Sequence, residues 1–195
     1  MRSRTKRIAS MLLSPKPREA TAAIVLAAGS STRMGGDVSK QFIELCGIPV
    51  LAHTLLAYQA TPSVSEIIVA ARREDFDRIA AIRKEYGITK LRHVVTGGKS
   101  RQESAARAFA KIGPDIRYVA VADAARCLTT PTEIEEVCTE AYRCRAASAA
   151  QRVVGTVKRT NKKGSVTGTV DRENLWEAQT PQVFHVALYA AALQR

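Results

Sequence analysis

From Ala22 onward, short apolar runs alternate with longer amphipathic segments, and this alternation constrains the fold more than any other feature. A continuous apolar run is typical of a strand covered on both faces, whereas amphipathic segments of ten or more residues are typical of helices. Strands that alternate with helices predict a Rossmann-like α/β fold with a mostly parallel sheet. The predicted strands are 22–28, 65–71, 91–96 and 117–122, and the predicted helices are 50–60, 74–86, 101–111 and 131–144.

Local signals support the predicted ends of three helices. Ser100 with Glu103, and Thr130 with Glu133, have the spacing of capping boxes, in which two side chains bond the free backbone groups of a first turn. Pro131 suits a first helical position. Gly87 is expected to end the second helix.

The alternation stops after position 145. Two extended segments, 152–160 and 165–170, flank the polar turn 161–164, a pattern typical of a β-hairpin. We therefore expect a protruding β-arm over about 150–172, followed by a short closing helix. The 195 residues favour one domain over 21–195.

The net charge of +12 is partly concentrated in residues 1–20, which hold six basic residues and one acidic residue. We expect this basic tail to be disordered, and its composition leaves a short transit sequence open. The other basic residues are dispersed and aromatic residues make up 5% of the chain, so no clustered nucleic-acid surface is expected. The charge suits a small polyanion such as a triphosphate instead.

No apolar run approaches the roughly 18–20 residues that cross a bilayer, so we expect no membrane partner. The four cysteines form no CxxC pair, and the three histidines lie far apart in the sequence, so no zinc site is predicted. Free cysteines of this kind suit a reducing cytoplasm.

A small-residue turn follows the first predicted strand at positions 27–36, with Lys40 shortly after it. Ligands of parallel sheets bind beyond the carboxyl ends of strands, and small residues let backbone N–H groups approach phosphate oxygens. The dinucleotide fingerprint GxGxxG is missing here. A Walker A loop ending at Gly98-Lys99-Ser100 is excluded as well, because its first glycine would fall on His93.

Four blocks together carry a specific resemblance: LAAGSSTRMGG with Lys40-Gln41, GGKSRQES (97–104), VADAAR (121–126) and TVDRENLWEAQTPQVF (169–184). In this order and spacing they resemble the 2-C-methyl-D-erythritol 4-phosphate cytidylyltransferase family, which has the nucleotidyltransferase fold. The resemblance implies an enzyme of isoprenoid precursor synthesis that transfers CMP from CTP to a polyol phosphate with release of pyrophosphate. It also implies Mg²⁺ or another divalent cation, and a homodimer through the β-arm.

The resemblance assigns roles at matching positions. Arg33, Lys40 and Arg172 would be catalytic, and Asp123 would bind the metal. Arg126, Thr156 and Arg172 would hold the acceptor. The nucleotide would be bound by Ala27, Ala28, Gly29, Ser30, Ser31, Gly97, Gly98, Ser104, Asp123 and Ala124. No general base is demanded, because the acceptor phosphate is already an anion and positioning with cations suffices.

The sequence departs from the family pattern at Ala122, Cys127 and Gly155, where the family usually has His, Pro and Asp. The chain also ends before the family's C-terminal segment, which carries a further acceptor-binding lysine. Two alternatives therefore stay open: a cytidylyltransferase for another polyol phosphate such as ribitol 5-phosphate, and an inactive nucleotide-binding paralogue.

Overall fold

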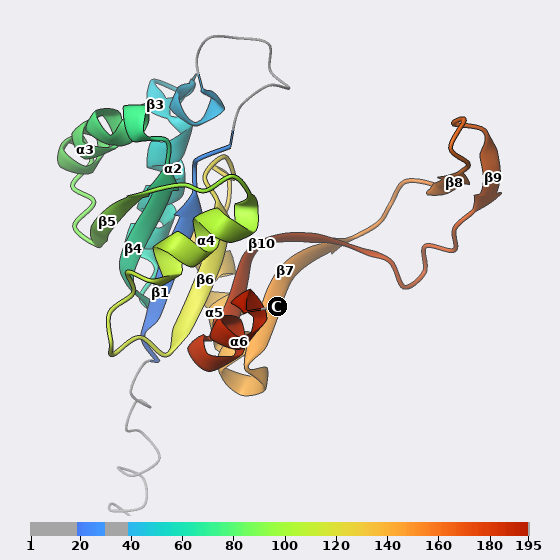
Figure 1. Cartoon of the computed structure of the whole chain (residues 1–195). Coiled ribbons are helices and arrows are strands. Elements are labelled where there is room, and N and C mark those ends of the chain that lie inside the picture. Colours follow the sequence, from blue (N-terminus) through green and yellow to red (C-terminus); the bar gives the residue numbers. More distant parts are fainter. Residues whose placement is uncertain (1–18, 30–38, 195) are drawn as a thin grey trace, which may run out of the picture.

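The computed structural model describes residues 19–29 and 39–194, and it contains a six-stranded sheet in the order β5-β4-β1-β6-β10-β7 (Figure 1). The first four strands in this order are parallel, and β10 runs antiparallel to both of its neighbours. The sheet is therefore mostly parallel, as the sequence predicts. Its strands are β1 (Thr21–Leu26), β4 (Val64–Ala71), β5 (Leu91–Thr96), β6 (Tyr118–Asp123), β7 (Ala146–Arg152) and β10 (Trp176–His185).

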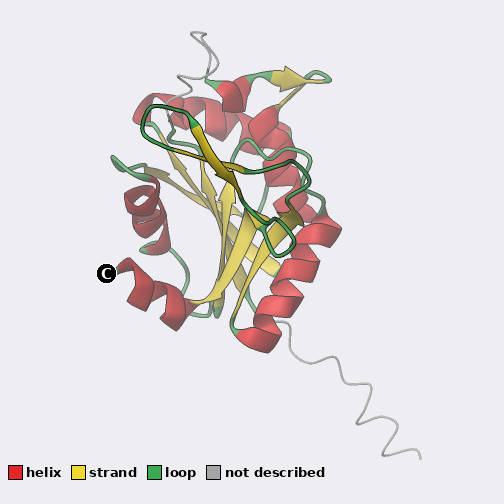
Figure 2. Cartoon of the chain, turned by 90° about the vertical axis from the view of Figure 1, so that its right-hand side faces the viewer, coloured by secondary structure: helices red, strands yellow, loops and turns green. Residues whose placement is uncertain are grey.

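Helices cover both faces of this sheet (Figure 2). Alternate side chains of β1 show why its apolar run is continuous: Ala23 and Val25 pack into one core and Ala22 and Ile24 into the other. The first core also contains buried residues of α2, α3 and α5, and the second contains residues of α4 and α6. The helices are α2 (Val50–Ala60), α3 (Phe76–Glu85), α4 (Arg101–Phe109), α5 (Pro131–Cys144) and α6 (Val186–Leu193).

The predicted helix ends hold with one correction. Thr130 and Glu133 form a complete capping box at α5, and Gly87 has the positive φ of 62° expected after α3. At α4, Ser100 accepts the Glu103 N–H, but the Glu103 carboxylate accepts the N–H of Lys99. The prediction of a capping box at Ser100 is therefore only half right, because the loop before α4 presents a different N–H to Glu103.

The arm is longer than the sequence suggests. Strands β7 and β10 pair and run out of the body, and the small hairpin of β8 (Lys158–Thr160) and β9 (Val166–Thr169) lies at the tip (Figure 1). The hairpin is confirmed, although its strands are shorter than predicted. Strand β10 was not predicted, because its mixed polar sequence pairs with two distant strands and has no local strand pattern.

The remaining elements are short. They are η2 (Lys40–Phe42), η3 (Arg73–Asp75) and the two-residue strands β2 (Glu44–Leu45) and β3 (Ile48–Pro49). Within the described ranges, no helix has the length and apolar character needed to span a membrane.

Candidate functional site

A cavity of about 720 Å³ lies where β1 and β6 end and where the loop after β5 enters α4. This volume is typical of a small-molecule site, and the carboxyl edge of a parallel sheet is the usual place for one. Basic side chains outnumber acidic ones on its walls. Its described lining residues are Leu26, Ala27, Ala28, Gly29, Lys40, Gln41, Gly98, Lys99, Ser100, Arg101, Ser104, Asp123, Ala124, Ala125 and Arg126.

The turn after β1 forms one wall of this cavity. The Ala27 N–H donates to the Ala70 carbonyl of β4 at 2.7 Å, so the turn begins from a fixed point of the sheet. Among the described residues, a Cβ atom at Gly29 would meet no atom within 4 Å, so none of them covers this backbone. The predicted residues Ser30, Ser31 and Arg33 lie outside the described residues.

Lys40 enters the cavity wall from η2, and its neighbour Gln41 fixes that element. Gln41 is buried, and its Nε2 donates to the Ala27 carbonyl at 3.1 Å. The Arg72 guanidinium bonds Ser39 on one side and ion-pairs with Asp75 at 3.0 Å on the other. These contacts hold η2, and with it Lys40, at the cavity wall beside the small-residue turn.

The loop from Gly97 to Ser100 forms the wall that adjoins the turn after β1. A Cβ at Gly97 would collide with the Cβ of Ala28, so the absence of a side chain lets this loop lie directly against the turn after β1. The buried Ser104 hydroxyl accepts the Gly98 N–H at 2.9 Å and donates to the Ser100 carbonyl at 2.9 Å. Ser104 therefore fixes the shape of the loop, and its predicted contact with the nucleoside stays a prediction.

Glu103 secures the same loop from α4. Its carboxylate accepts the Lys99 N–H at 2.7 Å and forms an ion pair with Arg107. The Lys99 N–H, followed by the Arg107 guanidinium, lowers the pKa of Glu103 below its usual value of 4.5. The Arg107 guanidinium also donates to the Gly97 carbonyl at 2.9 Å. The Glu103–Arg107 ion pair therefore holds the loop at both Lys99 and Gly97.

Asp123 lies at the end of β6 between two arginines. Arg101 approaches one carboxylate oxygen at 3.3 Å and Arg126 approaches the other at 3.4 Å. The next residue is held as well, since the Ala124 carbonyl accepts a buried hydrogen bond from Thr54 of α2 at 2.8 Å. The cavity thus combines one half-exposed carboxylate with several cations, an arrangement that suits a polyanion.

The described lining of the cavity offers one carboxylate to the divalent cation that the resemblance implies. Asp123 is the one acidic residue among the described cavity-lining residues, and within ranges 19–29 and 39–194 no group of three or more His, Cys, Asp or Glu residues could hold a metal. Mg²⁺ commonly binds through one or two carboxylates together with substrate phosphates. The residues therefore fit a cation that arrives with a nucleotide and is held by Asp123.

The structure brings most of the predicted nucleotide-site residues to this cavity, but Gly97 does not line it and instead packs against Ala28. Thr156 and Arg172 lie on the arm and do not line it. Gln41, Lys99 and Arg101 also line the cavity, and no role was predicted for them from the sequence. All three lie inside the quoted motif blocks, so their position there was the available signal.

Comparison with known proteins agrees with this geometry. The family model described as 2-C-methyl-D-erythritol 4-phosphate cytidylyltransferase matches residues 21–195. The enzyme of that name from Pelotomaculum thermopropionicum is 39% identical over 165 residues, which cover 84% of this chain and 69% of the relative. The one from Dehalococcoides mccartyi is 36% identical over 91% of this chain and 77% of the relative.

Solved structures are similar too. The 4-diphosphocytidyl-2C-methyl-D-erythritol synthase of Anaerococcus prevotii has a TM-score of 0.77 at 27% identity, covering 91% of this chain and 76% of that one. The 2-C-methyl-D-erythritol 4-phosphate cytidylyltransferase of Thermus thermophilus has a TM-score of 0.66 at 26% identity, covering 88% and 73%. With the sequence blocks, the sheet order and the cavity in agreement, the chain belongs to the 2-C-methyl-D-erythritol 4-phosphate cytidylyltransferase family.

Proposed function

We propose that this protein transfers CMP from CTP to 2-C-methyl-D-erythritol 4-phosphate and releases pyrophosphate. The observation that carries the proposal is the cavity at the carboxyl edge of the sheet, where a small-residue turn meets Lys40 and Asp123. The family membership supplies the identity of the two substrates. Other polyol phosphates have no specific observation in their favour.

In the proposed reaction, a phosphate oxygen of the acceptor attacks the α-phosphorus of CTP in line. The new P–O bond forms as the bond to the β-phosphate oxygen breaks, and the electron pair leaves with pyrophosphate. The backbone from Ala27 to Gly29 would bind the phosphates, while Lys40 and Arg33 would stabilise the charge that develops on them. A Mg²⁺ ion held by Asp123 would neutralise part of the phosphate charge.

The Gly97–Gly98 loop and Ser104 would bind the nucleoside, because Gly98 and Ser104 line the cavity beside the phosphate turn. Ala124 would contact the nucleotide from the end of β6. Arg126, which also lines the cavity, would offer its guanidinium to the acceptor phosphate.

Activity assays test this proposal. Pyrophosphate release is measured with CTP, Mg²⁺ and methylerythritol phosphate, and then with ribitol 5-phosphate or with no acceptor in its place. We expect release that depends on methylerythritol phosphate. Release of pyrophosphate only with ribitol 5-phosphate would identify a different acceptor, and CTP binding without any release would show an inactive nucleotide-binding protein.

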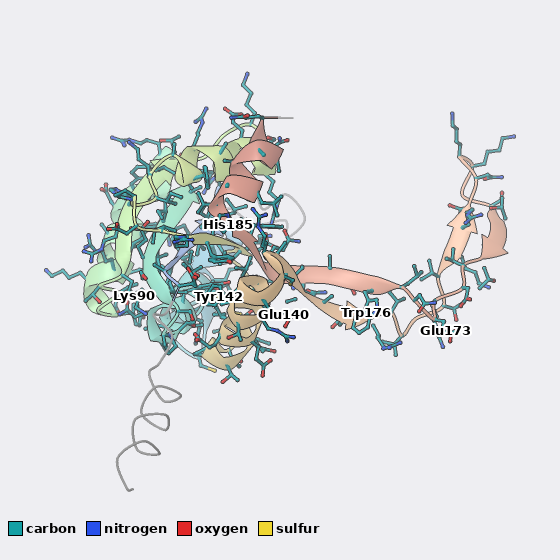
Figure 3. The ribbon with its side chains drawn as sticks, turned by 90° about the horizontal axis from the view of Figure 1, so that it is seen from below. Lys90, Glu140, Tyr142, Glu173, Trp176 and His185 are labelled. Atoms are coloured by element: carbon teal, nitrogen blue, oxygen red, sulfur yellow. The ribbon has the colours of Figure 1, made fainter. Side chains whose placement is uncertain are left out.

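We further propose that the protein is a homodimer through its arm and that Thr156 and Arg172 act in the cavity of the partner. Both residues lie on a segment that leaves the body, and the side chains labelled Trp176 and Glu173 in Figure 3 lie successively farther out on it. Trp176 is 54% exposed and Val154 is 83% exposed, so both offer apolar surface on the arm to a second copy. A second copy that covers them would remove this exposure.

Mixed dimers provide the test. Arg126→Ala removes a residue of the body and Arg172→Ala one of the arm, so each homodimer should lose activity. If arms cross, a mixed dimer regains one intact site, and an equal mixture after subunit exchange should recover about a quarter of the wild-type activity. No recovery despite shown exchange would place Arg172 in its own chain's site.

We propose the cytoplasm as the location, since all four cysteines are free thiols in the structure and reducing compartments keep thiols in this state.

A further inference from the structure

The strand that leads into the arm also passes the cavity and contacts two of its residues. Strand β10 pairs regularly with β7 up to Ala178 and again from Gln182, and its register shifts between these positions. In this irregular segment the Thr180 hydroxyl accepts the N–H of Asp123 at 3.2 Å. The side-chain carbonyl of Gln179 accepts a hydrogen bond from the Arg126 guanidinium.

Arg126 depends on few contacts for its orientation. Its Nε reaches the Asp123 carboxylate at 3.4 Å, which is long for a hydrogen bond, and its side chain is 38% exposed. The Gln179 contact engages a different nitrogen, Nη1, from a different strand. Two anchors on separate nitrogens fix the plane of a guanidinium, whereas one anchor leaves it free to rotate.

We propose that Gln179 is a positioning residue that orients Arg126 toward the acceptor phosphate, and that it does so from the strand connecting the cavity to the arm. The proposal rests on the proposed function, because it assigns Arg126 to the acceptor side. Gln179 itself touches no reacting atom. Its effect passes through Arg126.

Gln179→Met tests this role, because methionine keeps the length of the side chain and removes the acceptor oxygen. Gln151→Met is the matched control: Gln151 lies on the neighbouring strand β7, and its amide bonds the exposed Glu177 at 3.1 Å. Loss of one hydrogen bond to a charged group predicts a rise of about 10- to 100-fold in KM for methylerythritol phosphate. KM for CTP should stay within about twofold, and Gln151→Met should change neither constant.

A double-mutant cycle separates positioning from a general structural role. If Gln179 acts through Arg126, then Gln179→Met should cause no further loss of kcat/KM in the Arg126→Ala background. Gln179→Ala, which also lacks the acceptor oxygen, should reproduce the result, so the conclusion does not depend on one variant. An additional loss in the Arg126→Ala background would overturn the proposal.

The side-chain NMR signal of Arg126 gives a readout that does not require turnover. The Nε–H resonance, assigned by its disappearance in Arg126→Lys, should shift or broaden in Gln179→Met and stay unchanged in Gln151→Met. An unchanged resonance would overturn the proposal. If the wild-type protein releases no pyrophosphate with methylerythritol phosphate, the proposed function fails; if it does and Gln179→Met has wild-type constants, only the role of Gln179 fails.

Discussion

The cavity edge and the arm differ in how far their side chains are buried. At the cavity edge, buried groups such as Gln41, Ser104 and Thr54 hold three loops by hydrogen bonds to backbone atoms. On the arm, the side chains that bond backbone atoms, such as Asn161 and Arg172, are exposed, and Val154 and Val166 lie 83% and 62% exposed. One chain therefore suffices to shape the cavity, whereas nothing within the described residues of this chain covers the arm.

The cavity and the arm have different structural requirements. The cavity needs preorganised groups, since loops that rearrange during the reaction would lose part of the electrostatic stabilisation. The arm needs an accessible surface, since it can contribute residues to another molecule only if its own chain leaves it uncovered. We therefore expect substitutions at the cavity to change catalysis or folding, and equivalent substitutions on the arm to leave the isolated fold intact.

The largest expected effect is on catalysis at the cavity. Lys40→Ala should lose about 2–4 kcal/mol of transition-state stabilisation, as for loss of one preorganised electrostatic group. Steady-state kinetics at saturating CTP measure this loss. The control is Lys84→Ala, which removes an exposed lysine of α3 and should keep wild-type kcat. Wild-type turnover in Lys40→Ala would show that the ammonium group takes no part in the reaction.

The same substitution in the core and on the arm compares stability directly. Val69 is fully buried in β4, so Val69→Ala should lower the free energy of unfolding by about 1.5–3 kcal/mol. Val166→Ala on β9 should change it by less than about 0.5 kcal/mol. Urea denaturation monitored by circular dichroism gives both values. Equal losses of unfolding free energy would mean that Val166 is packed in solution, and that the arm is not an uncovered surface.

Two glycines offer the next comparison. Gly97→Ala inserts a methyl group against Ala28, and overpacking of this kind costs about 1–3 kcal/mol. We expect a higher KM for CTP together with reduced stability. Gly168→Ala on the arm adds a methyl group with no described atom within 4 Å of it. This substitution should change neither KM for CTP nor stability. Unchanged CTP affinity in Gly97→Ala would show that the loop can move away without loss of function.

The smallest expected effect is a dependence on pH at the Gly97–Ser100 loop. The pKa of Glu103 is lowered in the folded protein, chiefly by the Lys99 N–H, so its contribution to stability is present above pH 4.5 and is lost as pH falls through the lowered value. Because the Glu103 side chain is 39% exposed, we expect the Lys99 amide to lose protection against exchange, relative to its intrinsic exchange rate at each pH, as pH falls through this lowered pKa, with little change in global stability. Glu103→Gln should show no such acid-dependent step, and an identical step in that variant would assign it to another group.

Much of the fold was predictable because its signals are local. The apolar runs of β1, β4 and β6 predicted strands of a buried parallel sheet, and the Thr130 capping box placed the start of α5 correctly. Strand β10 has no such signal, because its residues 176–185 alternate irregularly and contain Pro181. Its strand character comes from pairing with β6 and β7, which no local pattern encodes.

In the candidate site, too, some features follow from local sequence patterns and others from tertiary packing. Sequence alone determined which segments reach the carboxyl edge of the sheet, because the alternation of strands with helices and the small-residue turns are short-range patterns. Only the tertiary structure decided the contacts that fix the side chains. Gln41 with Ala27, Arg101 with Asp123, and Arg126 with Gln179 join residues 14, 22 and 53 positions apart. Such pairs form when separate strands and helices pack together, and the spacing of residues along the chain does not predict them.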